Sequence, residues 1–486
     1  MNKTLRAAVA CATAAMLGAT LSACAVKAPA PQVDAQAPAQ WQAPLPHNGS
    51  RADLTTWWRS QTDRLLADLI DAAQTVSPTV SSAASRIAQS RADRVAAGAA
   101  LVPALDGTGS LSRANQQSLT PGGTTSQAAL QASWEIDLFG ANRAARDAAQ
   151  ARYDSAQAGW HDARVSVAAE TANQYFSLRA CQQLLDVAQQ DAASRADTAR
   201  LTELSAGAGF ESPANLALAR ASAAEGSSRY LSQRATCDVN VKALVALTAM
   251  PEPELRQRLA SGAANANLVG ASSGVTALPA QTLAQRPDVF TAEREVAAAS
   301  AEVGGARAQR YPRLTLSGAV GIANFRSGGE NTKTDTWTIG PLAVSVPIFD
   351  AGRRRANVDA ASARYDAAVV SYRASVRQAV SEVEQALVNL DSTAQRATAA
   401  DTALQGYRAS FNAVDQRYKN GMASLFELED ARRTRLNAEQ TVINLDRERS
   451  AAWVALYRAA GGGWTAPGTA SSAAAAAANH TSTTQQ

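Results

Sequence analysis

The chain has 486 residues, with 46 Lys and Arg against 42 Asp and Glu, and only 5% of its residues are aromatic. This near-neutral balance gives no reason to expect a nucleic-acid partner. Alanine dominates the composition, while Gly and Pro gather at a few places, which is typical of long, closely packed helices with sharp interruptions.

The N-terminus has the features of a secreted lipoprotein. Two basic residues precede an almost uncharged apolar stretch, and Leu-Ser-Ala then leads into Cys24. This order indicates a signal peptide over 1–23 and predicts a lipid on the Cys24 thiol; an ordinary signal peptide with a chance cysteine is the alternative. Three acyl chains would anchor the mature chain permanently. Because Ala25 stands where an Asp would favour inner-membrane retention, we expect the outer membrane.

The two halves of the mature chain follow the same plan. Short landmarks recur in the same order at separations that grow from 209 to 214 residues. They are Pro78 and Pro287, Pro103 and Pro312, Leu138-Phe139-Gly140 and Ile348-Phe349-Asp350, and Leu204-Ser205-Ala206-Gly207 and Tyr418-Lys419-Asn420-Gly421. A duplicated unit with small insertions explains both the order and the length of the chain.

The duplication suggests a division of the chain into five segments. They are the signal peptide 1–23, a lipid-anchored segment 24–76, a first repeat 77–275, a second repeat 276–464 and a tail 465–486. The tail consists almost entirely of small and polar residues, so we expect it to be disordered.

Each repeat begins with a helix and continues with two strands. Residues 80–102 and 289–311 have apolar residues at helical spacing and stop at a proline. Alternation of apolar and polar residues then predicts strands over 104–113, 127–138, about 314–322 and 337–346. In the last strand the alternation slips near Gly340-Pro341, as a β-bulge would allow.

The predicted strands have the length of tilted membrane-spanning strands. Two soluble hairpins, each with one face packed on helices, are the alternative, but the export signal and the lipid anchor favour the membrane. No stretch after Cys24 approaches the roughly twenty apolar residues of a membrane helix. Four strands are too few to close a barrel, since membrane barrels begin at about eight. Three chains would supply twelve strands.

The helices that follow the strands are unusually long. Residues 141–206 and 355–419 contain no proline and would each span roughly 100 Å. Shorter return helices are expected over about 212–250 and 424–458. The sequence therefore predicts a mainly α-helical protein with a membrane β-barrel, in which long helical hairpins form a helical barrel. Soluble coiled coils are the alternative.

Two cysteines, Cys181 and Cys237, remain in an oxidising compartment after export. Their midpoint falls in the turn Gly207–Gly209, so an antiparallel helical pair folded there brings them to the same height. We expect a disulfide; two separate buried thiols are the alternative, because height alone does not fix the direction of a side chain.

The sequence shows no sign of catalysis. His47, His161 and His480 have no metal-ligand spacing with Cys or acidic residues, and no nucleophile elbow, phosphate loop or zinc motif occurs. We expect no enzymatic activity, no cofactor and no metal.

Several motifs in a fixed order resemble the outer membrane efflux protein family, of the TolC and OprM kind and in its NodT-type lipoprotein branch. The resemblance runs from the lipid-attachment motif to about Trp464. It is carried by Trp134-Glu135-Ile136-Asp137-Leu138-Phe139-Gly140, Gln285-Arg286-Pro287-Asp288-Val289 with Ala292-Glu293, Ala306-Arg307-Ala308 before Pro312, Pro347-Ile348-Phe349-Asp350-Ala351-Gly352-Arg353, and Ala459-Ala460-Gly461-Gly462-Gly463-Trp464.

The resemblance implies a homotrimer with a twelve-stranded barrel in the outer membrane and a helical tunnel through the periplasm. It implies a periplasmic adaptor protein and an inner membrane pump of the resistance-nodulation-division class as partners. The exported substrates would be drugs, dyes, detergents or other small amphiphiles.

Site residues also follow from the resemblance. A periplasmic gate would correspond to Phe426, Asp430 and Arg433, although Glu429 stands where the family usually has an apolar residue. Asp430 and Arg433 as a merely exposed ion pair is the alternative. The two tight turns would dock the adaptor, and their residues are Gly207, Gly209, Asn420 and Gly421.

Two other functions stay open at this stage. The same fold could serve protein secretion beside an ABC transporter, as the outer membrane component of a type I system. Alternatively the chain could be a structural coiled-coil lipoprotein without a pore.

Overall fold

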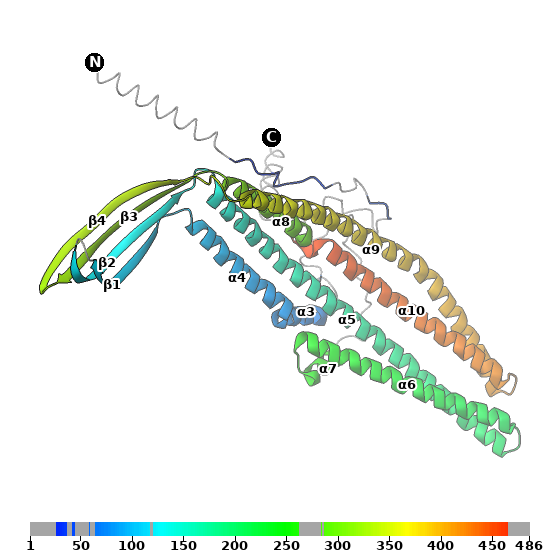
Figure 1. The fold of residues 1–486 in the computed structure, drawn as a ribbon. Helices are drawn as coiled ribbons and strands as arrows, with labels where there is room; N and C mark the ends of the chain where they lie inside the picture. Colours follow the sequence, from blue (N-terminus) through cyan, green and yellow to red (C-terminus); the bar gives the residue numbers. More distant parts are fainter. Residues whose placement is uncertain are drawn as a thin grey trace, which may run out of the picture. The chain divides into compact units, whose positions relative to one another are not determined.

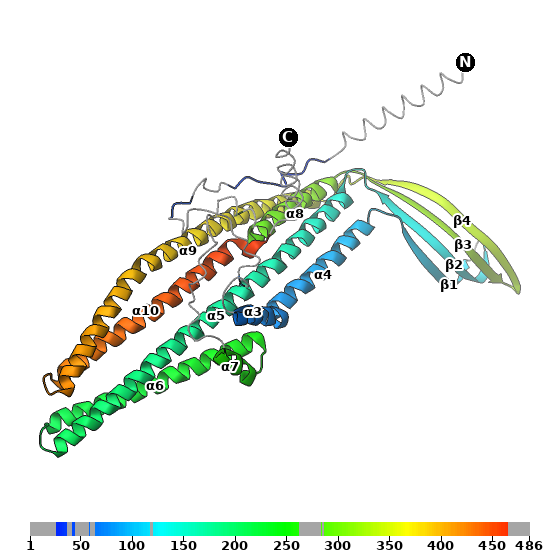
Figure 2. The same ribbon diagram turned by 180° about the vertical axis from the view of Figure 1, so that it is seen from behind.

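The computed structural model describes residues 26–35, 41–43, 58, 64–116, 120–261, 283 and 286–464. The expected signal peptide, Cys24 and the tail 465–486 lie outside the described residues. Ten long elements are labelled in Figure 1 and seen from behind in Figure 2. They are α4 (Pro78–Ala99), β1 (Ala104–Gln116), β2 (Thr120–Ile136), α5 (Ala141–Gly207), α6 (Pro213–Thr248), α8 (Pro287–Ala308), β3 (Arg313–Ser327), β4 (Glu330–Ser345), α9 (Arg353–Lys419) and α10 (Leu425–Ala459).

These ten elements agree with the predicted ones to within a few residues at the helix ends, while the strands extend further than predicted. Two short helices, α3 (Arg64–Val76) and α7 (Glu252–Ser261), were not predicted. The chain divides into two compact units, 1–35 with 84–158 and 290–375, and 36–83 with 159–289 and 376–486. Each unit therefore combines parts of both sequence repeats.

The first unit contains one antiparallel sheet in the order β1-β2-β3-β4. The register between β3 and β4 shifts between Leu316 and Gly318, opposite the cis peptide bond Gly340-Pro341. This is the bulge that the slipped alternation predicts. Gly321 lies where a side chain has no room, since a Cβ there would come within 2.4 Å of the Ala128 carbonyl oxygen of β2.

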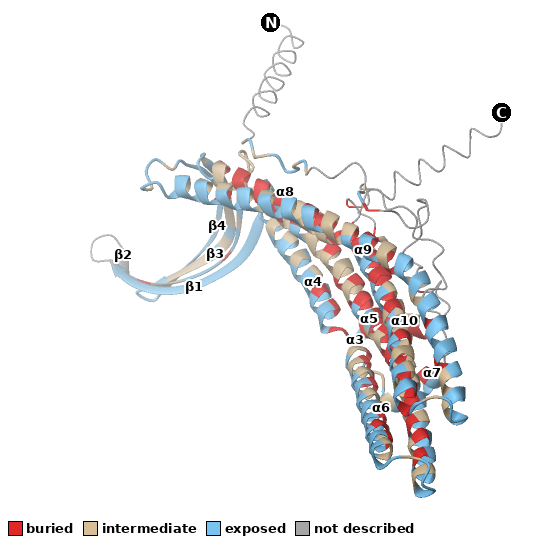
Figure 3. Cartoon of the chain, turned by 90° about the vertical axis from the view of Figure 1, so that its right-hand side faces the viewer, coloured by how far each residue is buried: buried red, intermediate tan, exposed pale blue. Residues whose placement is uncertain are grey.

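One face of the sheet is apolar and exposed. Cross-strand partners such as Leu130 and Val320 place large apolar side chains side by side, and Figure 3 shows the strands mostly in the colours of exposed and intermediate residues. Exposed members of this face are Leu105, Leu111, Leu130, Leu316, Val320, Ile322, Trp337, Ile339, Leu342 and Val344. These side chains are exposed, so no helix of the described chain covers this face. The alternative of soluble hairpins would require helices to pack on it.

The segment 26–35 lies along α8 and α9 in the same unit. The Arg307 guanidinium donates to the Lys27 carbonyl oxygen at 2.6 Å, and the Ser300 hydroxyl donates to that of Pro29 at 2.7 Å. Tyr365 of α9 donates to the Ala30 carbonyl oxygen at 2.9 Å. The chain that follows Cys24 is thus held near the end of α8 where β3 begins.

The second unit has the main apolar core. Helix α3 buries Leu65, Leu66, Leu69, Ile70 and Ala73, which share one face at helical spacing. They join buried side chains of α5, α6, α7, α9 and α10 in one cluster, which includes Tyr175, Leu244, Leu255, Leu387 and Leu456. Among the described helices, none is both long and apolar enough to cross a membrane.

Arg286, from one of the motifs of the family resemblance, is buried in this unit. Its guanidinium binds Asp288 at 2.6 Å and Glu382 at 2.7 Å and donates to the Ala459 carbonyl oxygen at the end of α10. Burial opposes the charge of Asp288, but Arg286 outweighs it and holds the pKa of that carboxyl below its usual range. The arginine therefore joins the start of α8 to α9 and to the end of α10.

Cys181 of α5 and Cys237 of α6 form a disulfide with a Cα–Cα distance of 5.6 Å. This is the pairing that the position of the turn predicts. The Gln233 side-chain amide of α6 donates to the Cys181 carbonyl oxygen of α5 at 3.3 Å, so a hydrogen bond also joins the two helices beside the disulfide.

Replacing both cysteines with serine should lower the free energy of unfolding by about 2–4 kcal/mol, because the cross-link restricts the unfolded chain. Thermal unfolding followed by circular dichroism checks this. A reductant should lower the melting temperature of the parent protein and leave that of the double variant unchanged. Equal melting temperatures of the parent protein and the variant in the absence of reductant would contradict the prediction.

Asp162→Asn should stabilise the second unit at neutral pH. Burial, together with the nearby Asp288 carboxylate, raises the pKa of Asp162. A carboxyl whose folded-state pKa is raised loses its contribution to stability as the pH rises through that pKa. Urea unfolding should show the variant as the more stable protein at pH 7.5, with the difference shrinking near pH 4. Asp186→Asn, on the exposed face of the same helix, is the control.

Candidate functional site

The candidate site lies at the tips of the two helical hairpins, in the second unit. In each turn a glycine has a left-handed backbone, Gly209 with φ +81° and Gly421 with φ +73°. The next residue's N–H reaches back to the helix, from Phe210 to Ser205 at 2.9 Å and from Met422 to Arg417 at 2.7 Å. Both helices therefore end in the same hydrogen-bonded turn that glycine favours.

The turns correct one landmark of the repeat. Gly209 and Gly421 occupy the same position in their turns and are 212 residues apart, whereas the sequence pairs Gly207 with Gly421 at 214. Gly207 is instead the last residue of α5. The sequence comparison went wrong because a Gly-Ala-Gly stretch offers two candidates, and only the backbone conformation distinguishes them.

The return helices begin with serine caps. Ser212 accepts a hydrogen bond from the Asn215 N–H before α6, and Ser424 forms a capping box with Glu427 before α10. These caps satisfy backbone donors at the helix starts, so each chain reversal is completed within a few residues.

Exposed apolar side chains mark both tips. Phe210 is 86% exposed and Met422 is 63% exposed, each directly after its turn glycine. Phe426, in the first turn of α10, is 75% exposed. Large apolar side chains that stay open at the end of a hairpin are candidates for contact with another molecule.

The three residues proposed for the gate lie on one exposed face of α10. Phe426, Asp430 and Arg433 follow the helical spacing of four and three residues, so they form one row. Arg433 binds Asp430 at 2.5 Å, and their side chains are 72% and 54% exposed. The structure thus places the three residues in one row on α10, and the charged groups of Asp430 and Arg433 are exposed to solvent.

A buried ion network, which was not predicted from the sequence, lies behind this row. Arg432 is fully buried and binds Glu429, and Glu429 also accepts a hydrogen bond from Arg195 of α5 at 2.5 Å. Arg195 in turn binds Asp191 at 2.9 Å. The Arg432 guanidinium also donates to the Thr198 hydroxyl of α5 at 3.0 Å. The network joins the first hairpin of the chain to the second.

Helix geometry explains why neighbouring residues differ. Successive residues turn by about 100°, so Glu429 and Arg432 face α5 while Asp430 and Arg433 face outward. Burial lowers the pKa of Arg432, an effect that the nearby Arg195 adds to and that the Glu429 and Asp191 carboxylates oppose. Glu429 faces two buried guanidinium groups, which gives a physical reason for an acidic residue at a position where the family resemblance implies an apolar one.

Close packing at this level requires a glycine in α6. A Cβ at Gly226 would come within 2.8 Å of the Arg195 side chain and 3.4 Å of the Ala192 backbone. Nearer the tips, Phe411, Leu425 and Leu428 form an apolar cluster with Ala219, and the hydroxyls of Thr202 and Tyr418 are 3.0 Å apart. Contacts between the hairpins thus continue up to the turns.

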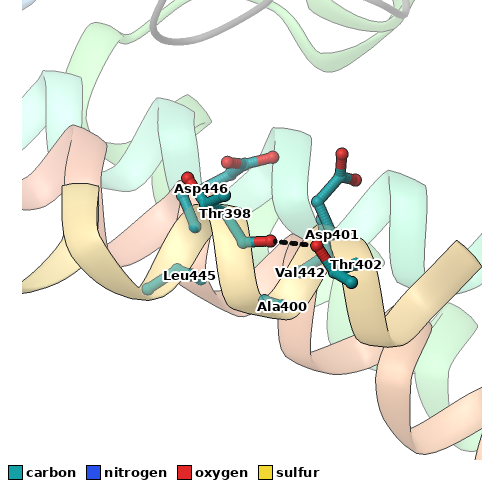
Figure 4. A pocket seen from close by; sticks show the side chains of 8 residues that line it. Thr398, Ala400, Asp401, Thr402, Val442, Leu445 and Asp446 are labelled. Atoms are coloured by element: carbon teal, nitrogen blue, oxygen red, sulfur yellow. Dashed lines mark hydrogen bonds between the residues drawn. The ribbon is translucent and has the colours of Figure 1, made fainter.

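A pocket of about 390 Å³ lies between α9 and α10. Figure 4 shows Asp401 and Asp446 among the side chains that line it, and the Thr402 hydroxyl donates to the Thr398 carbonyl oxygen beside them. Burial, together with Asp401, raises the pKa of Asp446. No group of three or more His, Cys, Asp or Glu that could hold a metal occurs within the described ranges.

Comparisons with known proteins agree with this architecture. The model of the family described as "Outer membrane efflux protein" matches residues 69–249 and 278–462. The solvent efflux pump outer membrane protein SrpC of Pseudomonas putida is 30% identical over 412 residues, which cover 83% of this chain and 86% of that protein. The pyoverdine export outer membrane protein OpmQ of Pseudomonas putida is 30% identical over 472 residues, which cover 93% of this chain and 97% of that protein.

A solved structure of the outer-membrane channel OprN superposes with a TM-score of 0.76 at 26% identity, over 89% of this chain and 99% of that one. The fold is thus that of a channel protein of the outer membrane. The chain belongs to the outer membrane efflux protein family and is a channel component of an efflux pump.

Glu429→Ala should destabilise the protein by about 3–5 kcal/mol, because it leaves two buried guanidinium groups without their shared carboxylate. Asp430→Ala, one residue further along, removes an exposed pair and should cost less than about 1 kcal/mol. Thermal unfolding of the two variants beside the parent protein measures the difference. Equal losses would show that the buried network contributes no more than the exposed pair.

Proposed function

We propose that the protein is the exit duct of a tripartite efflux pump. In this proposal three copies assemble in the outer membrane, their twelve strands close into one sheet, and their hairpins enclose a tunnel through the periplasm. A periplasmic adaptor and an inner membrane pump of the resistance-nodulation-division class complete the path. Drugs and other small amphiphiles are the substrates, and the protein works without catalysis.

The observation that carries the proposal is the pair of hairpin tips beside an open charged row. Phe210 and Met422 are exposed at the turns, where an adaptor would bind. The row of Phe426, Asp430 and Arg433 presents both an apolar group and charge on one face of α10. Three copies of this row around an axis would ring a narrow mouth with charge.

The apolar face of the sheet supports a membrane position. Side chains such as Trp337, which is 73% exposed, and Ile339, which is 88% exposed, would face lipid. We assign the lipid anchor to Cys24. The segment that follows it is bonded to the end of α8 at the start of the strands, which would place an acylated Cys24 near the membrane.

The buried network suggests which contacts open. Because Arg195, Glu429 and Arg432 join the two hairpins of one chain with little exposure to water, breaking this contact costs several kcal/mol. The Asp430–Arg433 pair is exposed, so separating its two charges costs less than about 1 kcal/mol. We therefore assign the closed state to the exposed row.

Planar bilayer conductance tests the proposal. The parent protein should give small steps, and an Asp430→Ala, Arg433→Ala double variant should give much larger ones because the charged constriction is removed. A matched control is Asp415→Ala, Lys419→Ala, which removes another ion pair of 2.7 Å near the same tip. The control should conduct like the parent protein.

Two outcomes would contradict the proposal. If folded, oligomeric protein gives no current in any variant, the proposal of a conducting duct is wrong. A structural lipoprotein then becomes the better interpretation. If the control opens the pore as much as the double variant, the gate does not lie in the row of Phe426, Asp430 and Arg433.

A further inference from the structure

Most basic side chains of the sheet lie at its loop end, away from the helices of the first unit (Figure 1). The strands contain four Lys and Arg residues. Arg313 is the first residue of β3, at the helix end. The other three are Arg113, near the end of β1, Arg326, near the end of β3, and Lys333, near the start of β4. The charge is therefore distributed unevenly along the strands.

Strand pairing places these three side chains on one face of the sheet. Arg113 of β1 and Arg326 of β3 both pair with Thr124 of β2, so they lie in one row across the sheet. Lys333 of β4 pairs with Asn324, two residues before Arg326 on β3. Residues that are directly opposite, or two apart on one strand, share a face. We call Arg113, Arg326 and Lys333 the rim cations.

The rim cations share the exposed apolar face of the sheet. Val320, six residues before Arg326, pairs with Leu130 of β2 and with Trp337 of β4, and all three apolar side chains are exposed. The register is continuous from Val320 to Arg326, so an even number of residues keeps both on the same side. Towards the loops this face therefore changes from large apolar side chains to cations.

The positive charge of the rim cations is not compensated nearby. All three residues are exposed, and among the described residues none of their side chains forms a hydrogen bond or an ion pair. The strands have one acidic residue on this face, Asp335, which pairs with Ile322 and is exposed as well. Three positive charges thus stand against one negative charge.

The opposite face has no basic residue at the same level. Its rows towards the loops consist of Ser110, Gln127, Ala323 and Thr334, then Ser112, Thr125, Phe325 and Thr332, and last Ser327 and Glu330. If the rim cations served only to keep the loop end soluble, we would expect cations on both faces. Their restriction to the apolar side indicates a partner that meets this side alone.

The rim cations lie at the height expected for a membrane surface. Arg326 is ten residues beyond Leu316, the first exposed apolar residue of β3. A strand that rises about 3.4 Å per residue and is tilted by about 40° covers roughly 25 Å over this stretch, which is the height of the apolar band of outer membrane barrels. The helices and the segment after Cys24 lie at the other end. The rim cations therefore face the outer leaflet.

We propose that the rim cations bind the phosphate groups of a glycolipid in the outer leaflet, of the chemistry of lipid A. The inference rests on the proposed barrel and adds the lipid that the barrel contacts. Guanidinium groups bind phosphate through paired donors, and the Lys ammonium binds it as a compact charge. Neighbouring strands are about 4.8 Å apart, so Arg113 and Arg326 are about 10 Å apart across β2. They can therefore hold two phosphates of one headgroup.

The order of groups along the face identifies a lipid as the occupant. The cations continue directly into the apolar face, so an amphiphile with phosphates above its acyl chains matches both parts at once. Thr124 and Asn331, in the same row as Arg326, offer neutral polar groups to the sugars of a headgroup. A soluble anion would use the charges alone, and the apolar face beside them would remain uncovered.

Native mass spectrometry of the full-length protein in neutral detergent tests the inference, with bisphosphorylated lipid A as the probe. The parent protein should retain the lipid, and the Arg113→Gln, Arg326→Gln, Lys333→Gln variant should bind it about tenfold more weakly or worse. Lipid A without its phosphates should bind both proteins equally weakly. Added salt should weaken binding to the parent protein, because salt screens exposed charges.

The matched control removes three exposed cations at the helix end of the sheet. The Arg310→Gln, Arg313→Gln, Arg353→Gln variant loses the same charge and should bind lipid A as the parent protein does. An Arg113→Lys, Arg326→Lys variant should keep most of the binding. The single Arg326→Gln variant should lose part of it, so the test does not depend on the folding of the triple variant.

Three results would overturn the inference. The first is equal affinity of the parent protein and the folded rim variants for lipid A. The second is an equal loss of affinity in the control, which would show that only net charge matters. The third is displacement of the lipid by inorganic phosphate, which would show that the rim cations recognise a free anion.

Bilayer conductance separates this inference from the proposed function. A rim variant that conducts as the parent protein does but has lost lipid A would support the lipid site and leave the duct intact. A parent protein that binds lipid A through the rim cations without conducting would support the lipid site and count against the duct.

Discussion

The organisation of the chain depends on the hydrogen bonding of an open sheet. Strands β1 and β4 each pair on one side only, so a row of backbone donors and acceptors along each edge has no partner among the described residues. In a medium without water such groups cost several kcal/mol each. A chain that exposes an apolar sheet with two free edges is therefore incomplete by itself.

Local sequence patterns were sufficient to predict most of the fold. The alternation from Gln127 to Leu138 marked β2, and the slip near Gly340-Pro341 marked the bulge. Absence of proline over two long stretches predicted helices of 67 residues each to within three residues. These features are local, so they depend little on what the chain later packs against. Helix α3 has an equally regular apolar pattern. It was not predicted because the segment 24–76 was interpreted only as a lipid-anchored segment, with no helix of its own.

The candidate site could be predicted only in part. Phe426, Asp430 and Arg433 were found through the family resemblance, and the structure places them on one face of α10. The network of Arg195, Glu429 and Arg432 escaped prediction because its members come from helices 234 residues apart in the chain. Arg432 and Arg433 look alike in the sequence, and only the packing of α10 against α5 makes one of them buried. The unusual Glu429 was the one signal available, since an acid at a usually apolar position needs a partner.

The equal length of α5 and α9 limits where this protein can change its length. A residue inserted in the middle of either helix would rotate everything beyond it by about 100° and move the turn glycine by 1.5 Å. Buried arginines would then point to solvent, and exposed ones would enter the core. The increase in separation from 209 to 212 residues occurs between Pro103 and Gly140, so the repeats have diverged in length at the sheet and its junction instead. Between the two repeats of this chain, the strands and their junctions with the helices differ in length, whereas the two long helices have the same residue count.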